Sequence, residues 1–380
     1  MKTPDPIPPP KHLVVRLPNP AGDVVAATPA LRALRTALPS TRITWCGRPP
    51  ALALLDGLDA RDAVMPVEGV TAHGALAARR LGRAWGAAGA DAVLLLPNSW
   101  PSAWAARASG AAVRAGYVLR PRPRWIPAAL VPSSREEMLT HALPVPREGG
   151  RVRPEPMRTW YLRLAALFGA KDDGLPARLA VTPEGESLAC RRLSAPGFVG
   201  GFFAVSPGAA FGPSKVMPSG TVAEIVQAVR ARTGFVPLVL GGPGEEATVA
   251  EVAALVGPPC LSTAADPARW PETKALLARA SLLLTTDAGP RHVATALGTP
   301  VVVWMGPTDP RWSEGGIVRG SIAGTEGGGG GTTVVRREDL SCLGCHLKVC
   351  PIGHPCLSAL DPLEVVKAAV ARVRKPPKGC

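Results

Sequence analysis

The densest group of side chains that could bind a ligand stands in residues 282–310, LLLTTDAGPRHVATALGTPVVVWMGPTDP. An apolar run at 282–284 ends in a polar turn that holds Asp287, Gly289 and His292. A helical stretch and a second apolar run lead into another polar turn. In open α/β sheets, ligands bind where parallel strands end. Carboxylate, imidazole and helix-end amides beside glycines suit a ligand that carries sugar hydroxyls and phosphate.

This stretch resembles the donor-site motif of glycosyltransferase family 9, the ADP-heptose:lipopolysaccharide heptosyltransferases, which reads D-[ST]-G-x-x-H-x-A-A-A-L-G-x-P and then G-P-T-x-P. The resemblance implies that Asp287 binds donor sugar hydroxyls, that His292 contacts phosphate or sugar, and that the amides of Ala288 and Gly289 bind the diphosphate. Ala288 departs from the motif, where Ser or Thr is usual. The matching positions are Asp287, Gly289, His292, Ala294, Ala296, Leu297, Gly298, Pro300, Gly306, Pro307, Thr308 and Pro310.

An aspartate stands directly before a predicted helix near the amino terminus. Its surroundings, PNPAGDVVAATPAL, resemble the family's G-D-x-x-x-x-T-P-A-L, and the resemblance implies that Asp23 is the general base. Sugar transfer from a diphosphate donor needs such a base, because the accepting hydroxyl loses its proton as it attacks the anomeric carbon. The residues alone fit a helix N-cap equally well, a role that holds a carboxylate acidic.

A glycine- and proline-rich turn, SPGAAFGPSK, follows the apolar run at 202–205 and resembles the family's phosphate-contacting P-G-A-x-x-G-P-x-K-x-W-P. We expect Gly208 and Gly212 to let the backbone approach an anion, and Lys215 to offset charge on the ADP leaving group. Val216 and Met217 stand where Arg and Trp are usual. Without the resemblance, a turn with one lysine is typical of a solvent-exposed loop.

A third turn, GGPGEE, follows a predicted strand and opens a predicted helix. It is not a Walker P-loop, because no GK[ST] follows. The resemblance implies that a glutamate here holds the nucleoside ribose, and the sequence does not choose between Glu245 and Glu246. The alternative is that both acids complement the dipole of the first helical turn.

The chain is basic, with 43 Lys plus Arg against 29 Asp plus Glu, which favours an anionic partner. The resemblance implies an anionic lipid-linked saccharide acceptor at the membrane surface, bound by the amino-terminal domain. We expect Arg120 and Arg122 there, together with Arg107, Arg114 and Arg124, to steer it. Two alternatives remain, a solvated basic surface and an arginine excess typical of a GC-rich genome. No nucleic acid partner is expected, since no helix-turn-helix, zinc-finger or aromatic RNA-binding pattern is present.

Four cysteines lie close together near the carboxyl terminus, at Cys342, Cys345, Cys350 and Cys356. Four thiolates can hold zinc tetrahedrally, but the spacing C-x2-C-x4-C-x5-C is not that of a standard finger or ribbon. Similar Cys-rich tails occur in the family, whose catalysis needs no such metal. We therefore expect no required cofactor and, by default, reduced thiols. A disulfide within the cluster stays open, and structural zinc is the less favoured alternative.

Apolar runs that alternate with helical stretches predict an α/β fold, and the resemblance implies the GT-B architecture of two doubly wound Rossmann-like domains facing across a cleft. Residues 172–201 are expected to hold the interdomain linker. No apolar run reaches membrane-spanning length and no secretory leader is recognised, so the expected location is the cytoplasm, peripherally at the inner face of the membrane. The predicted divisions are a disordered Pro-rich tail at 1–11, an acceptor-binding domain at 12–185, a nucleotide-sugar donor-binding domain at 198–360, and a helix and tail at 361–380.

The expected activity is inverting transfer of heptose from ADP-L-glycero-D-manno-heptose to a lipopolysaccharide inner-core acceptor. The departures at Ala288, Val216 and Met217 leave open another nucleotide sugar or another cell-envelope glycan acceptor. A non-catalytic sugar-nucleotide-binding protein on the same fold is the second alternative.

Overall fold

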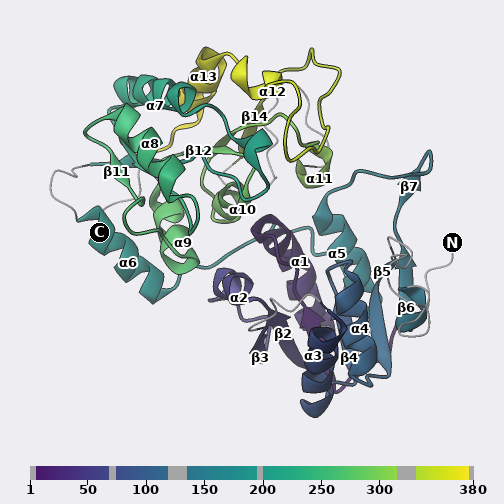
Figure 1. The fold of residues 1–380 in the computed structure, drawn as a ribbon. Coiled ribbons are helices and arrows are strands. Elements are labelled where there is room, and N and C mark those ends of the chain that lie inside the picture. Colours follow the sequence, from purple (N-terminus) through teal and green to yellow (C-terminus); the bar gives the residue numbers. More distant parts are fainter. Residues whose placement is uncertain (1–5, 68–73, 119–134, 195–199, 315–330, 376–380) are drawn as a thin grey trace. The chain divides into compact units, whose positions relative to one another are not determined.

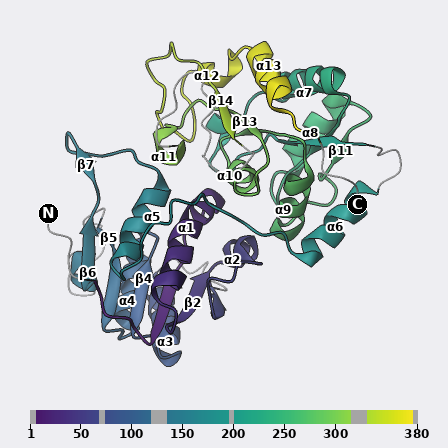
Figure 2. The same ribbon diagram turned by 180° about the vertical axis from the view of Figure 1, so that it is seen from behind.

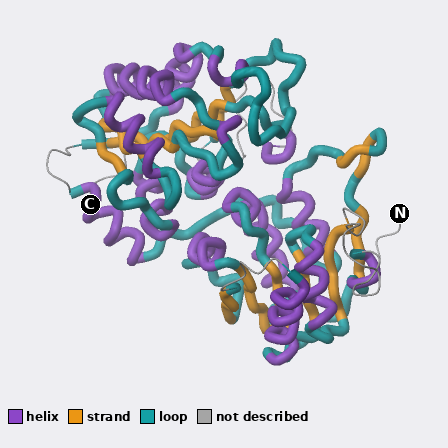
Figure 3. The backbone as a smooth tube through the Cα atoms, in the orientation of Figure 1, coloured by secondary structure: helices purple, strands orange, loops and turns teal. Residues whose placement is uncertain are grey.

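The computed structural model describes residues 6–67, 74–118, 135–194, 200–314 and 331–375. The chain divides between Ala177 and Arg178 into two compact units. Each unit is built on one six-stranded parallel sheet with helices around it (Figures 1 and 3). The predicted α/β class with two doubly wound, Rossmann-like units is confirmed.

The first sheet has the strand order β3-β2-β1-β4-β5-β6, and all neighbouring strands are parallel. A short antiparallel pair, β7 (Arg147–Glu148) and β8 (Arg151–Val152), follows it. The main elements are β1 (His12–Arg16), α1 (Ala21–Ala37), β2 (Arg42–Gly47), α2 (Pro49–Leu55), β3 (Ala63–Pro66), α3 (Ala75–Ala87), β4 (Ala92–Leu95), α4 (Trp100–Ala108), β5 (Val113–Val118), β6 (His141–Pro144) and α5 (Met157–Ala166).

The second sheet repeats this order as β11-β10-β9-β12-β13-β14, again with parallel neighbours. Its elements are α6 (Pro183–Leu193), β9 (Phe202–Ser206), α7 (Ser219–Thr233), β10 (Val236–Val239), α8 (Glu246–Val256), β11 (Leu261–Ser262), α9 (Trp270–Arg279), β12 (Leu283–Thr286), α10 (Gly289–Ala296), β13 (Val301–Trp304), α11 (Arg311–Glu314), β14 (Thr332–Val335), α12 (Pro355–Ser358) and α13 (Pro362–Arg372). Strand order reverses direction between β9 and β12, the place where such sheets bind ligands.

Helices cover both faces of the first sheet. α1 packs along α5, and α3 packs along α4 as a separate pair (Figures 1 and 2). Gly82 allows the close approach of α3 to α4, since a Cβ there would lie 2.2 Å from the carbonyl oxygen of Ala105. The central strands are buried along their whole length, as the near-continuous apolar runs of a doubly covered parallel sheet require.

Three observations differ from the sequence-based predictions. α6 lies inside the segment expected to be linker, and Thr182 caps it by accepting from the amide of Gly185. Ile7, expected in a disordered tail, is buried, and its amide donates to the carbonyl of Leu167 at 2.7 Å. The strands β6 and β14 and the helix α9 were not predicted. The Pro- and Gly-rich composition of 120–132 and 327–331 predicts loops, and of these residues only Gly331 lies within the described ranges.

No helix in the described ranges combines the length and apolarity needed to cross a bilayer.

Candidate functional site

Asp23 lies in the first turn of α1, in the loop that follows the carboxyl end of β1. The helix begins at Ala21 with Pro20 in the capping position, so the N-cap interpretation of Asp23 is wrong. The reason is that the chain turns into the helix directly after Pro20, three residues earlier than the sequence pattern predicts. The half-buried Asp23 carboxylate accepts no hydrogen bond from any residue that the structure describes.

The surroundings of Asp23 favour its protonated form. Burial raises the pKa of Asp23 to about 6. Tyr161 on α5 lies close enough that the charge of Asp23, after burial, contributes to raising the pKa of the Tyr161 hydroxyl. A carboxylate whose pKa lies near neutrality and which lacks fixed donors is suited to take a proton from a hydroxyl group.

The second unit gathers its candidate residues at one edge of its sheet. The loops after β9, β10, β12 and β13 all leave the carboxyl ends of parallel strands. Lys215 lies in the first of these loops, Glu245 in the second, Asp287 in the third and Thr308 in the fourth. Residues that are up to about a quarter of the chain apart therefore meet at the point where the strand order reverses.

Asp287 is the centre of a hydrogen-bonded network at this edge. Lys215 Nζ donates to Asp287 Oδ2 at 2.9 Å and to the Asp287 carbonyl at 2.8 Å. Arg291 Nη1 donates to Oδ1 at 2.5 Å, and Thr308 Oγ1 donates to Oδ2 at 2.6 Å. Both carboxylate oxygens are thus engaged by the protein. This arrangement holds Lys215 in place, and the expected binding of sugar hydroxyls by Asp287 stays a prediction.

Charge dominates the behaviour of this network. Burial raises the pKa of Asp287, but the positive charges of Arg291 and Lys215 outweigh that effect and hold the pKa well below its usual range. Burial, reinforced by the charge of Arg291, lowers the pKa of His292 to about 3. His292 is therefore a neutral imidazole at physiological pH, able to donate one hydrogen bond and accept another.

Contacts with described residues hold both the side chain and the backbone of Lys215 in place. Its side chain is only 11% exposed, and Nζ lies 4.9 Å from the centre of the Phe211 ring. Thr286 Oγ1 donates to the backbone carbonyl of Lys215 at 2.5 Å. The ammonium group is consequently preorganised at the carboxyl edge of the sheet, where it can stabilise an anion without first losing side-chain freedom.

The backbone amides at the start of α10 differ from the prediction. The amide of Ala288 donates to the carbonyl of Thr286 at 2.8 Å, and Pro290 has no amide hydrogen. The Ala288 amide is thus already used, and Gly289 is left as the helix-end amide without a partner among the described residues. The positive end of the α10 dipole still favours an anion at this position.

The two glutamates that the sequence could not distinguish have different environments. Glu245 is half-buried, accepts from the amide of Gly242 at 3.0 Å, and lies against Gly208. Glu246 is exposed and accepts twice from the amide of Gly244. Glu245 lies on the side of the sheet edge that faces the β9 loop, which carries Lys215. It is therefore better placed than Glu246 to bind a ribose.

The two glycines of the β9 loop serve contacts within the protein. A Cβ at Gly208 would lie 2.3 Å from Glu245 Oε1, and one at Gly212 would lie 2.8 Å from the carbonyl oxygen of Lys348. Both glycines therefore permit close packing against Glu245 and Lys348, and the expectation that they let the backbone approach an anion stays a prediction. The amide of Ser214 also donates to the Lys348 carbonyl, at 3.2 Å, so residues 346–348 brace the Lys215 turn.

Two members of the network were not assigned a role from the sequence. Arg291 is fully buried and pairs with Asp287 four residues earlier, a spacing that brings side chains together on a helix and was visible in the sequence. Thr308 matched the second motif, but its partner is distant in the sequence. Among the arginines expected on the acceptor side, Arg120 and Arg122 lie outside the described residues, and Arg114 lies near the amino end of β5.

The four clustered cysteines follow β14, and the last of them lies in α12. Cys342 and Cys345 are exposed, Cys350 is half-buried, and Cys356 is buried against Gly306. Within the described ranges, no group of three or more His, Cys, Asp or Glu side chains is arranged to hold a metal ion. These thiols are free, whereas Cys190 is disulfide-bonded, which differs from the expectation of reduced thiols throughout.

Comparison with known proteins agrees with this geometry. Residues 78–316 match the profile of glycosyltransferase family 9 (heptosyltransferase). Lipopolysaccharide heptosyltransferase 3 of Escherichia coli is 32% identical over 87 residues, which are 22% of this chain and a quarter (25%) of the length of that protein.

Two solved structures share the fold over almost the whole chain. The E. coli ADP-heptose lipopolysaccharide heptosyltransferase II structure has a TM-score of 0.69 at 20% identity, covering 94% of this chain and 97% of that one. A family 9 glycosyltransferase from Veillonella parvula has a TM-score of 0.72 at 20% identity, covering 94% and 95%. These likenesses confirm the GT-B class of the two Rossmann-like units. With more than half of its length matched by the family profile, the chain belongs to glycosyltransferase family 9, the heptosyltransferase family.

Proposed function

We propose that the chain is an inverting glycosyltransferase that moves heptose from ADP-L-glycero-D-manno-heptose to a lipopolysaccharide inner-core sugar. The observation that carries the proposal is the carboxylate of Asp23, which has no hydrogen-bond partner among the described residues and whose pKa is about 6. Such a group can accept a proton at physiological pH, and a merely structural aspartate would have donors fixed on it.

The donor follows from the second unit. Lys215, held by Asp287, offers a fixed positive charge to the diphosphate, and the start of α10 offers a helix dipole to the same group. Glu245 is placed to accept hydrogen bonds from ribose hydroxyls. The neutral His292 hydrogen-bonds to sugar or phosphate. We prefer ADP-heptose among the nucleotide sugars for two reasons. The chain belongs to the heptosyltransferase family, and the similar E. coli structure is that of an ADP-heptose lipopolysaccharide heptosyltransferase.

The reaction needs one base and one stabilised leaving group. Asp23 takes the proton from the acceptor hydroxyl as its oxygen bonds to the anomeric carbon of heptose. The bond from that carbon to the phosphate oxygen breaks on the opposite face, which inverts the anomeric centre. Lys215 stabilises the negative charge that ADP gains. The proton ends on Asp23 and the electron pair on ADP, and no metal is required by this sequence of events.

The acceptor and the location form the less constrained part of the proposal. A lipid-linked inner-core saccharide carries phosphates and carboxylates, which suit a chain with a formal charge of +14. We place the protein peripherally at the inner face of the cytoplasmic membrane. Ala288, which lacks the hydroxyl usual in the motif, and the buried Met217, which replaces Trp, favour a different donor sugar as the second candidate.

Purified protein tests the proposal directly. ADP release is measured with ADP-heptose and a heptose-deficient lipopolysaccharide acceptor, beside a panel of UDP-, GDP- and other ADP-sugars. The proposal expects turnover with ADP-heptose only when acceptor is present, and loss of turnover in Asp23→Asn with donor binding retained. Turnover of a UDP-sugar and none of ADP-heptose would reject the donor. Donor binding without transfer to any acceptor would favour the non-catalytic alternative.

A further inference from the structure

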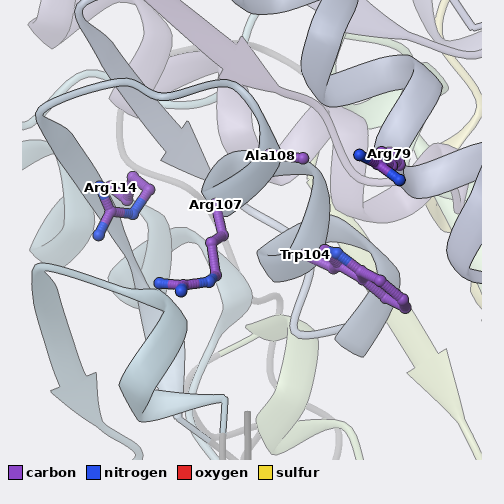
Figure 4. A pocket seen from close by; sticks show the side chains of 5 residues that line it. All are labelled: Arg79, Trp104, Arg107, Ala108 and Arg114. Carbon is purple, nitrogen blue, oxygen red and sulfur yellow. The ribbon is translucent and has the colours of Figure 1, made fainter. Parts of the chain in front are cut away.

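A second concave site lies on the first unit, away from the loop of Asp23. It is an open groove of about 470 Å³ on the outer side of α4, lined by Arg79, Trp104, Arg107, Ala108 and Arg114. Trp104, Arg107 and Ala108 are spaced three and four residues apart on one face of α4. In the view of Figure 4, Arg107 lies between the side chains of Arg114 and Trp104, and Arg79 lies on the Trp104 side. Three of the five lining residues are therefore cations, and none is an acid.

The groove is at a different edge of the sheet from the proposed base. Arg114 is the second residue of β5, so it lies near the amino end of a strand that is parallel to β4 and, through it, to β1. Asp23 follows the carboxyl end of β1. Parallel strands put their amino ends at one edge and their carboxyl ends at the other. The groove is therefore not part of the carboxyl edge at which Asp23 lies.

No described acid forms an ion pair with the cations of the groove. In the described part of the chain, the side chains of Arg79 and Arg107 make no ion pair and no hydrogen bond. Among the described residues, the Arg114 side chain donates only to carbonyl oxygens, those of Met138 at 2.8 Å and Ala111 at 2.6 Å. Burial and then the nearby charge of Arg107 lower the pKa of Arg114, as expected for two close cations without an acid between them. An anion in the groove would relieve this repulsion.

The sequence around the groove also contains cations without nearby acids. No Asp or Glu stands between Asp91 and Glu136, a stretch that supplies all of α4 and β5. α3 also has no acid and exposes Arg80 and Arg83 beside the groove residue Arg79. The surface is not purely charged, because the Leu76 side chain on α3 is 73% exposed and Trp104 is half-buried with its ring lining the groove.

We propose that this groove, with the exposed side of α3, binds the phosphate groups of anionic membrane phospholipids and thereby docks the first unit on a membrane surface. Arginines form bidentate hydrogen bonds with phosphate oxygens. Tryptophan and a solvent-exposed leucine are the side chains that enter the headgroup region beside such cations. An open groove admits headgroups that project from a surface. A site for a free sugar phosphate would have no use for exposed Leu76.

This inference goes beyond the proposed transfer reaction, which leaves the docking surface undefined, and its test does not depend on turnover. Binding of the full chain is measured by co-sedimentation with phosphatidylcholine vesicles and with vesicles in which a third of the lipid is phosphatidylglycerol. The test variant is Arg79→Gln/Arg107→Gln. The matched control is Arg191→Gln/Arg232→Gln, which removes the same charge from exposed positions of the second unit.

The wild-type chain is expected to bind only the phosphatidylglycerol vesicles, and concentrated NaCl is expected to release it. Since each cation near an anionic membrane contributes about fivefold in affinity, the test variant should bind about 30-fold more weakly. The control should stay within about twofold to threefold of wild type, because its cations lie on the other unit and contribute only unspecific attraction. Equal melting temperatures of the test and control variants would show that weaker vesicle binding does not result from unfolding.

Three results would overturn the inference. Wild-type binding that does not depend on phosphatidylglycerol would exclude an anionic lipid site. Equal weakening of vesicle binding in the test and control variants would mean that net charge alone, and not the groove, causes the binding. Displacement from vesicles by inorganic phosphate or glucose 6-phosphate, beyond that of NaCl at the same ionic strength, would make the groove a soluble-anion site. Calorimetric titration with ADP reports on the proposed function separately, so failure of one proposal is distinguishable from failure of the other.

Discussion

Replacement of Asp23 by asparagine should stabilise the protein in a pH-dependent way. The folded-state pKa of Asp23 is about 6, against an ordinary value of 3.8. Full ionisation of this carboxylate in the folded state therefore costs up to about 3 kcal/mol relative to the unfolded chain. Because the side chain is half-buried and partly screened by solvent, we expect about 1–2 kcal/mol to be measurable.

The sign follows from proton binding. Between pH 4 and 6 the folded state holds the Asp23 proton while the unfolded state has released it, so the free energy of unfolding of the wild type falls as pH rises through this window. Asp23→Asn has no such proton. The variant should match the wild type below about pH 4 and exceed it above about pH 7 by the full 1–2 kcal/mol, which corresponds to roughly 2–8 °C in the melting temperature of the first unit.

Calorimetric melting of the full chain across pH 4–8 measures this difference. The matched control is Asp59→Asn, which makes the same change of charge at an exposed aspartate and should give no pH-dependent gain. A difference between Asp23→Asn and wild type that is constant across this range would refute the reasoning. It would mean that hydrogen-bond donors or water stabilise the ionised Asp23 carboxylate in the folded state. Its pKa would then not be raised, and the physical reason for its role as a base would be lost.

Three further predictions concern the second unit. Lys215→Met should lower kcat by about 10²–10³-fold through loss of charge stabilisation at the leaving group, while the fold survives in circular dichroism. Glu245→Gln should weaken ADP binding about tenfold or more by calorimetry, with Glu246→Gln as a near-neutral control; the reverse ranking would contradict the ribose assignment. Arg291→Met should cost about 3 kcal/mol or more in urea unfolding, because it leaves the buried Asp287 undercompensated; a loss below 1 kcal/mol would contradict the network.

The elements that position the site were predictable where local pattern decides them. The strands that begin at His12, Ala92 and Val301 are continuous apolar runs, which only a doubly covered parallel sheet accommodates. α6 was missed because its polar composition resembles a linker, although Thr182 and Pro183 form a recognisable helix start. β14 follows the glycine run at 327–331, and its four residues pair only with β13, a partner that sequence does not reveal.

The site residues were predictable as a set, and their mutual contacts were not. Motif resemblance selected Lys215, Asp287 and Thr308, which the structure brings within hydrogen-bond distance. Sequence could not show that Asp287 uses both oxygens on protein partners, because those partners come from two separate loops and a helix. Without the resemblance, the local sequence also suggested a cap role for Asp23, because a shift of the helix start by a few residues changes which side chain can reach the free amides.

The central claim is that Asp23 removes the acceptor proton. The pH dependence of kcat/KM for heptose transfer, measured for wild type and Asp23→Asn, tests it most directly. We expect the wild-type rate to rise through an apparent pKa near 6 and then level, and the variant to lose this limb together with about 10²–10⁴-fold of the plateau rate. A variant that retains the limb, or that turns over within tenfold of wild type at pH 8, would contradict the assignment.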